Sequence, residues 1–457
     1  MESARRSAVP SLVNRRGVDV VDNVGGTREF VSVFAPPHRR ALMNIILHEM
    51  GTYAHVQQLA KALAFRGHEI SYIYCDSFQS PSSSSVGFDP TDKVAVLPVG
   101  LNSQFAKRNL AKRFVQERAY GTQVTTIMAR LQPDLIISGN TPIEIQAAIQ
   151  RMCQRCGTPF LFWLQDVYSI GVKAVVSKLP ILGHLIAARY DLLERTVVRR
   201  SDGIVAISDD FYDLMVVNWH VDPRRISVIP NWAELPAFPQ PAKENDWTAR
   251  QGLSGKHILL YSGALGFKHN PQLFLDLASE FRDEPDVYIV VISEGYGAEW
   301  LSRHRQGYPR LVLLPYQTAE DFPKALASAD VLIAILEPDA ARYSVPSKVL
   351  SYMTAGRPIL AAIPPRNLAA RTIIAASSGV VVDPNDPSGL RHLARSLMDD
   401  EDRRKGLGTA ALAYARANFE INIIANRFEE IFQRTVGQRL VRDAALFRPI
   451  ETPARLR

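Results

Sequence analysis

The chain has 457 residues, of which 47% are hydrophobic and 22% are charged, and it carries a formal net charge of +7. This length suggests two or three domains, and the composition is that of an ordinary globular protein. No stretch reaches the roughly 18 consecutive apolar residues of a membrane-spanning helix, and the first residues lack the apolar segment of a secretory signal. The sequence therefore predicts a cytoplasmic protein.

The excess of basic residues restricts the choice of partners. Nucleic acid fits such a charge, but we find no nucleic-acid fold motif and no platform of aromatic and basic residues. An anionic membrane surface or a phosphate-bearing substrate fits as well. Cys153 and Cys156 have C-x-x-C spacing, yet no second Cys or His pair lies nearby, so the spacing indicates reduced thiols on a helix. We therefore expect no nucleic acid partner and no metal at these cysteines.

Strand patterns and helix patterns alternate along the chain. Residues 1–40 are basic, contain proline and show no clear periodicity, so we expect a largely disordered arm. From 41 to 230, apolar runs typical of buried parallel strands are separated by helical patterns, the first of them at 56–65. The predicted strands of this block are residues 41–48, 69–75, 134–138, 159–164 and 203–207.

A proline-rich linker at 231–256 interrupts this alternation, which resumes from 257 to 415. The predicted strands of the second block are residues 257–262, 287–292, 311–314, 331–336 and 358–362, with a helix at 270–282. Two such blocks indicate an α/β protein with two facing Rossmann-like domains of parallel strands and a ligand cleft between them. A long amphipathic helix is predicted at 402–436. Its part within 416–440 could cross back to the first domain, before a tail at 441–457.

One segment, residues 346–358 with the sequence PSKVLSYMTAGRP, has the pattern of a phosphate-binding helix start. Pro346 suits the first turn of a helix, Ser347 and Lys348 would lie in that turn, and Gly356 would end the helix. Free backbone N–H groups and the helix dipole at such a terminus attract phosphate. A plain strand–helix–strand unit with a surface lysine explains these residues equally well when they are taken alone.

Two glycine loops have a similar character. Gly263 and Gly266 stand between a predicted strand and a helix, and Lys268 follows them. Such a loop allows close approach of the backbone to an anion, and the lysine can reach phosphate oxygens. Gly51 opens the first helix in the same way. Both patterns are common, and a simple turn accounts for each on its own.

Together, these segments resemble the GT-B glycosyltransferases, in particular the retaining family 4 enzymes that use nucleotide sugars. The resemblance extends over roughly residues 41–436 and rests on 49–63, 229–231, 261–268, 292–295 and 346–358. It implies UDP- or GDP-sugar as donor and no cofactor. The substrate-binding residues that it implies are Gly51, His55, Asn231, Gly263, Gly266, Glu294, Tyr343, Ser347, Lys348 and Ser351.

The chain departs from the family pattern at some positions. Tyr343 and Ser351 stand where the family usually has two glutamates, and Gln165 replaces a common histidine. The mechanism implied is metal-independent transfer with retention, in which Lys268 and the helix start at Lys348 stabilise the leaving diphosphate. Asp166, at the end of a predicted strand, would orient the acceptor or act as base, although a turn cap explains it too. Lys268 and Asp166 are thus the predicted catalytic residues.

The acceptor and the location follow from the same resemblance, since several members extend lipid-linked sugars in O-antigen, capsule or exopolysaccharide synthesis. Residues 172–200 mix large apolar residues with Lys173, Lys178, Arg189 and Arg195. Such a helical stretch could lie on the inner face of the cell membrane as a peripheral contact with anionic lipid. A core-facing helix with a solvated face explains the pattern equally well.

Other functions stay open at this point. A nucleotide-sugar epimerase of the same fold is one alternative, and an inactive nucleotide-binding scaffold, suggested by Tyr343 and Ser351, is another. A dinucleotide oxidoreductase would need a G-x-G-x-x-G segment after a strand, which neither block supplies.

Overall fold

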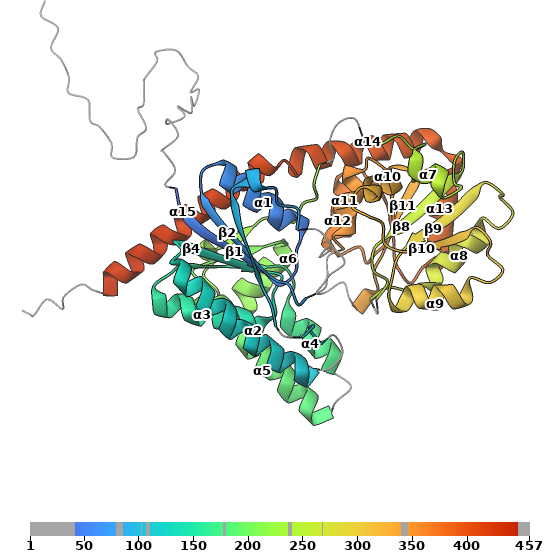
Figure 1. Ribbon diagram of the computed structural model, residues 1–457. Helices are drawn as coiled ribbons and strands as arrows, with labels where there is room; N and C mark the ends of the chain where they lie inside the picture. The colour runs from blue at the N-terminus through green and yellow to red at the C-terminus, as the bar shows by residue number, and fades with distance from the viewer. Residues whose placement is uncertain are drawn as a thin grey trace, which may run out of the picture. The chain divides into compact units, whose positions relative to one another are not determined.

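The computed structural model of the chain describes residues 42–78, 86–101, 103–106, 110–176, 180–235, 240–266, 268–339 and 346–446 (Figure 1). The predicted arm at 1–40 and the candidate residue Tyr343 lie outside these ranges. Within them, the strands form two sheets, and all their pairings are parallel. The two parallel sheets confirm the predicted α/β class with two Rossmann-like folds.

The first sheet has the strand order β3-β2-β1-β4-β5-β6-β7. Its strands are β1 (Asn44–Glu49), β2 (Glu69–Cys75), β3 (Val94–Val99), β4 (Leu135–Gly139), β5 (Phe160–Leu164), β6 (Gly203–Ala206) and β7 (Ile226–Val228). The central strands β4 and β5 are buried throughout, as is expected where helices cover both faces of a parallel sheet. The strand order reverses between β1 and β4, and a crevice for a ligand opens at such a reversal.

The helices that accompany the first sheet are α1 (Ala54–Phe65), α2 (Leu110–Leu131), α3 (Ile143–Cys156), α4 (Tyr168–Val176), α5 (Pro180–Arg200) and α6 (Asp209–Asp213), with short 3₁₀ or π turns at Pro90–Asp92, Leu214–Asn218 and Pro223–Arg225. α5 packs against both α3 and α4. The sequence predicted one helical stretch over 172–200, but the structure has two helices there. Pro180 explains the separate start of α5, because proline suits a first turn and cannot continue a preceding helix. No helix in the described ranges is long and apolar enough to cross a membrane.

The second sheet has the order β10-β9-β8-β11-β12-β13. Its strands are β8 (His257–Ser262), β9 (Val287–Ile292), β10 (Leu311–Leu314), β11 (Val331–Ile335), β12 (Ile359–Ala362) and β13 (Gly379–Val382). The helices that accompany it are α7 (Asp246–Arg250), α8 (Gln272–Glu280), α9 (Tyr296–His304), α10 (Asp321–Ala327), α11 (Lys348–Thr354), α12 (Leu368–Ala375), α13 (Pro387–Asp399) and α14 (Glu401–Asn418). Here the order reverses between β8 and β11.

The predicted linker at 231–256 is irregular only in part, because α7 lies inside it. The Asn245 side chain begins this helix by accepting hydrogen bonds from the backbone N–H of Trp247 at 2.9 Å and of Thr248 at 3.3 Å. Asp246 then pairs with Lys324 of α10 at 3.1 Å. The end of the stretch is therefore attached to the helices of the second sheet.

The single helix predicted at 402–436 is also two helices, α14 and α15 (Ile421–Leu446). Phe419 ends α14 with a buried ring, and the Glu420 carboxylate caps α15 by accepting from the N–H of Ile423 at 2.9 Å. α15 packs on α1, where Arg66 donates to Glu429 at 2.8 Å. The C-terminal helix thus returns to the layers of the first sheet (Figure 1).

Candidate functional site

The reversal between β8 and β11 positions the strongest group of candidate residues. In open α/β sheets, ligands bind beyond the carboxyl ends of the strands at such a reversal. The loop after β8 carries Gly263, Gly266 and Lys268, and the chain after β11 leads into α11, whose first residue is Lys348. The fold therefore brings the two predicted lysine segments, which are far apart in the sequence, to the same edge of the sheet.

Lys348 lies directly against the glycine loop. Its Nζ is 3.8 Å from the centre of the Tyr261 ring and donates a hydrogen bond to the Tyr261 hydroxyl, which in turn donates to the Ala264 carbonyl at 2.9 Å. Gly263 has a φ of +141°, and a Cβ there would lie 3.1 Å from Lys348 Nζ. Glycine at this position thus permits both the backbone conformation and the approach of the lysine.

The two lysines influence each other electrostatically. Burial, together with the positive charge of Lys268, lowers the pKa of Lys348 well below its usual range. Burial and both lysines also lower the pKa of His269 to about 3, so this imidazole is neutral, and its Nδ1 accepts from the Gly266 N–H at 3.2 Å. An anion bound beside the two ammonium groups would offset this repulsion and stabilise the charged form of Lys348.

A second tyrosine fixes α11 against β8. The buried Tyr352 hydroxyl accepts from the Ser262 N–H at 2.9 Å, which sets the position of the helix that carries Lys348. Neither Tyr261 nor Tyr352 was predicted from the sequence as a support of the site. Tyr261 belongs to the glycine-loop segment and Tyr352 to the 346–358 segment. A tyrosine in an otherwise apolar run was the available signal, because a buried hydroxyl needs a partner.

The other predicted residues of the second half lie around this pair but make different contacts. Ser347 is exposed immediately before α11 and does not cap it. Ser351 is half-buried one turn later, and its carbonyl accepts from Thr354 at 2.9 Å. Glu294 is exposed after β9, and its carbonyl accepts from the N–H of Leu265 in the glycine loop at 3.4 Å.

Gly297, in the first turn of α9, packs so closely against Leu265 of the glycine loop that no side chain fits there. A Cβ at this position would lie 2.7 Å from Leu265 Cβ and 2.9 Å from the Leu265 carbonyl oxygen, which already accepts from the Gly297 N–H at 2.8 Å. We expect Gly297→Ala to lower the free energy of unfolding by about 1–3 kcal/mol, as overpacking does, in urea denaturation. Gly406→Ala in α14 is the control, since its Cβ would meet nothing within 4 Å. Equal stability of the two variants would contradict the role of Gly297.

The first sheet contributes a buried carboxyl group beside Gly51. Glu49 ends β1, and its Oε1 accepts from the Tyr53 N–H at 2.9 Å and from the Tyr72 hydroxyl. Burial raises the pKa of Glu49 to about 8, so the carboxyl group is mostly protonated at neutral pH. Gly51 itself is buried in the loop between β1 and α1. This loop lies at the β1–β4 reversal and is braced by neutral hydrogen bonds.

His55, on α1, is part of an aromatic cluster. Its ring centre lies 5.6 Å from that of Trp163 and 5.5 Å from that of Trp232, edge-on to both. Burial lowers the pKa of His55 to about 4, and its buried Nε2 has no hydrogen-bond partner among the described residues. The neutral ring packs α1 against the two indoles, and contact of His55 with the substrate stays a prediction.

Asp166 connects the two groups of candidate residues. It follows β5, and although part of its side chain reaches solvent, the surrounding protein raises its pKa to about 6, while the charge of Lys268 acts in the opposite direction. The preceding Gln165 accepts from the Asn231 side chain at 2.6 Å, so these two amides are held together. The electrostatic interaction of Asp166 with Lys268 indicates that these two side chains lie near each other, as residues that act on one substrate must.

Two family models match the chain, and their order is the order of the two sheets. Residues 50–232 match the model described as "Glycosyl transferase 4-like domain", and residues 256–400 match "Glycosyl transferases group 1". The two regions together cover most of the chain. The chain belongs to the group 1 glycosyltransferases. This membership confirms the resemblance on which the candidate site was built.

Relatives and solved structures agree with this membership. The glycosyltransferase chain is 26% identical over 232 residues to the putative colanic acid biosynthesis glycosyl transferase WcaI of Escherichia coli, a match that spans 50% of this chain and 56% of WcaI. It is 25% identical over 300 residues to the probable glycosyltransferase WbjE of Pseudomonas aeruginosa, spanning 65% and 73% of the two chains. The Anabaena protein HepE, solved with UDP-glucose, has a TM-score of 0.62 at 13% identity, over 86% of this chain and 99% of HepE. The last likeness confirms the GT-B fold.

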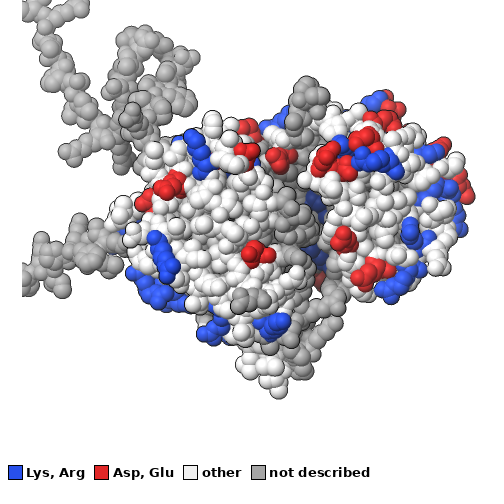
Figure 2. Space-filling model, in the orientation of Figure 1, with Lys and Arg blue, Asp and Glu red and all other residues white. Residues whose placement is uncertain are grey.

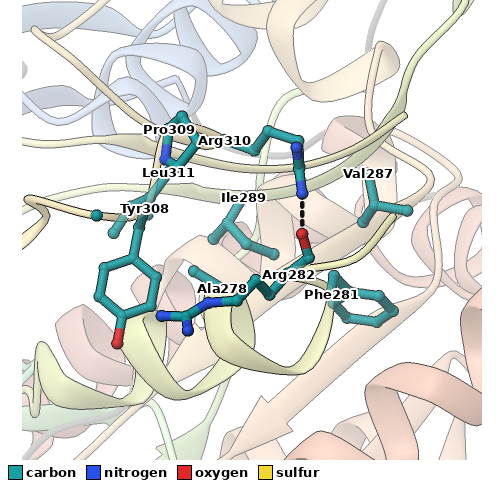
Figure 3. Close-up of a pocket in the computed structure, with 10 residues that line it drawn as sticks. Ala278, Phe281, Arg282, Val287, Ile289, Tyr308, Pro309, Arg310 and Leu311 are labelled. Atoms are coloured by element: carbon teal, nitrogen blue, oxygen red, sulfur yellow. Dashed lines mark hydrogen bonds between the residues drawn. The ribbon is translucent and has the colours of Figure 1, made fainter. Parts of the chain in front are cut away.

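A separate cavity lies at the opposite edge of the glycosyltransferase's second sheet (Figure 3). It has a volume of about 290 Å³ and is bounded by the end of α8 and the first residues of β9 and β10. Figure 3 shows Arg282 beside the Tyr308 ring, with its Cζ 5.4 Å from the ring centre, and Arg310 donating to the Arg282 carbonyl. The cavity thus lies at the amino ends of β9 and β10, whereas Lys268 and Lys348 lie beyond the carboxyl ends of the strands. It is therefore not part of the site that holds the two lysines.

Proposed function

We propose that this protein transfers a sugar from a UDP- or GDP-sugar to a saccharide acceptor, with retention at the anomeric carbon and without a metal ion. The observation that carries the proposal is the pair of interacting lysines, Lys268 at the end of the glycine loop after β8 and Lys348 at the start of α11, against that loop. In the group 1 glycosyltransferase fold, this edge of the second sheet suits the diphosphate of the donor.

The chemistry of such a transfer matches the charges of the site. As the bond from the sugar to the diphosphate breaks, negative charge develops on the leaving group. Lys348 is desolvated and already positioned by Tyr261, so it needs little reorganisation to stabilise that charge. Asp166, near Lys268, is suited to orient the acceptor hydroxyl or to take its proton, because its pKa of about 6 leaves it ionised at neutral pH.

The acceptor that we propose is a lipid-linked saccharide in the synthesis of a cell-surface polysaccharide. Support comes from WcaI, whose name assigns it to colanic acid biosynthesis. Because the match spans just over half of WcaI, the acceptor is proposed for this chain by analogy with its family.

The test begins with thermal melts of the full chain with UDP, GDP and a panel of nucleotide sugars, since a ligand that binds the folded state raises the melting temperature. We expect stabilisation by one base and its sugar, followed by release of the nucleoside diphosphate when a saccharide acceptor is added. If no nucleotide and no nucleotide sugar raises the melting temperature, the result would favour an inactive scaffold. An isomerised sugar formed without any acceptor would identify an epimerase, and loss of activity with a chelator would overturn metal independence.

A further inference from the structure

An exposed apolar surface lies on the helix pair that follows Asp166. Figure 1 shows the first half of α5 extending beyond the first sheet, beside α4. Isolated exposed hydrophobic residues are normal, but a group of them on adjoining elements indicates an interaction surface. We call this group the α4–α5 tip; its members, with their exposed fractions, are Val175 (63%), Ile181 (81%), Leu182 (60%), Leu185 (64%) and Leu192 (68%).

The helical positions show that the tip is not the core face of α5. Ile181, Leu185 and Leu192 share one side of a helix with 3.6 residues per turn. The residues that α5 buries, among them Glu194 and Val198, lie on the opposite side. The side of α5 that faces solvent therefore carries large apolar side chains, which contradicts an ordinary amphipathic helix with a charged outer face.

The charge exposed around the tip is mainly positive. Lys173 of α4 is exposed, and Arg189 of α5 has half of its side chain exposed while it pairs with Glu144 at 2.6 Å. The Arg189 guanidinium also lies 5.4 Å from the Phe114 ring centre, which brings the first turns of α2, with the exposed Arg118, beside α5. In Figure 2, the lowest part of the described surface is uncharged, and basic side chains lie above it.

The acidic side chains of these helices are largely turned inward. Glu117 and Glu194 are buried, and Glu144 has only 10% of its side chain exposed, whereas Asp191 is partly exposed and pairs with Arg195 at 2.9 Å. An apolar patch with a cationic margin is complementary to an anionic bilayer, whose headgroups attract the cations while the apolar side chains enter the interface. A second copy of this chain fits less well, because a symmetric contact would place like charges against each other.

The tip is also tied to the candidate site. Asp166 lies two residues before α4, and the buried Glu194 of α5 accepts from the Tyr168 N–H and the Ser169 N–H, each at 2.8 Å, at the start of α4. The helix pair therefore runs from the site at one end to the apolar tip at the other. We propose that the α4–α5 tip docks on a membrane that contains anionic phospholipids, with Lys173, Arg118 and Arg189 at the headgroups. This inference stands independently of the sugar transfer, because it rests on the surface alone.

The experiment is flotation of the full chain with vesicles of phosphatidylcholine alone and of phosphatidylcholine mixed with phosphatidylglycerol. We expect binding only to the mixed vesicles and a loss of binding as salt screens the cations. The double variant Ile181→Asp with Leu185→Asp should weaken vesicle binding by at least about tenfold, since it puts charge where apolar side chains enter the interface. Leu440→Asp with Val441→Asp, two exposed residues of α15, is the matched control and should bind like the parent.

Further readouts separate the remaining outcomes. If the double variant at the tip melts abnormally, Lys173→Glu serves in its place and should weaken binding to the anionic vesicles without changing the melting temperature. Equal binding of the tip variant and the control, or no binding of the parent to either vesicle, would overturn the proposal. So would a concentration-dependent dimer that the tip variant abolishes, because the occupant would then be a second copy. No nucleotide sugar is present, so failure of the proposed transfer would not alter these results.

Discussion

Replacing Lys348 with alanine is expected to reduce kcat/KM for the donor by about 10²–10³, the usual cost of removing one preorganised group that stabilises developing negative charge. The reason is its position. Lys348 is desolvated, it is held by the Tyr261 hydroxyl and ring, and Gly263 keeps the space beside it open.

Lys268 is more exposed, so Lys268→Ala should weaken binding of the donor diphosphate by a few kcal/mol at most, as for a charged hydrogen bond.

Three variants and calorimetry with the nucleoside diphosphate test this difference. The double variant of Lys268 and Lys348 should lose more than the sum of the single effects, because removing Lys268 alone lowers the cost of charging Lys348 and so offsets part of its own loss. Lys405→Ala is the control, since its exposed ammonium pairs only with Glu401 among the described acids within 4 Å, at 2.7 Å. Unchanged nucleotide affinity and unchanged turnover in Lys348→Ala would exclude the lysine pair as the diphosphate site.

The sequence predicted the buried strands of both sheets well and missed three of the four edge strands. β2, β8 and β9 begin and end at the predicted residues, because a strand buried on both faces is a continuous apolar run. The edge strand β10 was also predicted with its observed bounds, since its four residues are all apolar. The overlooked strands are β3, β7 and β13, each at the edge of its sheet. β3 is largely half-exposed and contains Pro98, and β7 has only three residues. A short or half-exposed edge strand such as β3 or β7 lacks a long apolar run, so sequence periodicity does not reveal it.

The candidate site was predictable in its parts but not in its arrangement. The glycine loop and the lysine before α11 were visible as local patterns, since both depend on turn and helix-start chemistry. The contact of Lys348 with Tyr261 depends instead on the pairing of β8 with β11, which joins distant parts of the chain. His55 was assigned to substrate by resemblance, and this stays a prediction; its edge-on packing against two stacked indoles depends on the fold, which brings them together.

The proximity of Asp166 to Lys268 leads to the second large expected effect. If Asp166 orients or deprotonates the acceptor, Asp166→Asn should lower kcat by about 10²–10⁴ and leave the affinity for the nucleoside diphosphate unchanged. The carboxylate is the active form, and the surrounding protein raises its pKa to about 6 although the side chain reaches solvent. Activity of the parent should therefore be nearly complete above that pH and fall as the pH decreases through about 6.

The pH profile separates this role from a structural one. Lys268 lowers the pKa of Asp166, so Lys268→Ala should move the acidic limb of the profile to higher pH, and Asp166→Asn should remove the limb. Asp286→Asn is the matched control, because it neutralises an exposed carboxylate that pairs with Lys256 and should change neither kcat nor the limb. An acidic limb that persists in Asp166→Asn would assign the titration to another group. A merely structural Asp166 would change the melting temperature without moving the limb, since only a group that must be ionised for turnover links the rate to its own pKa.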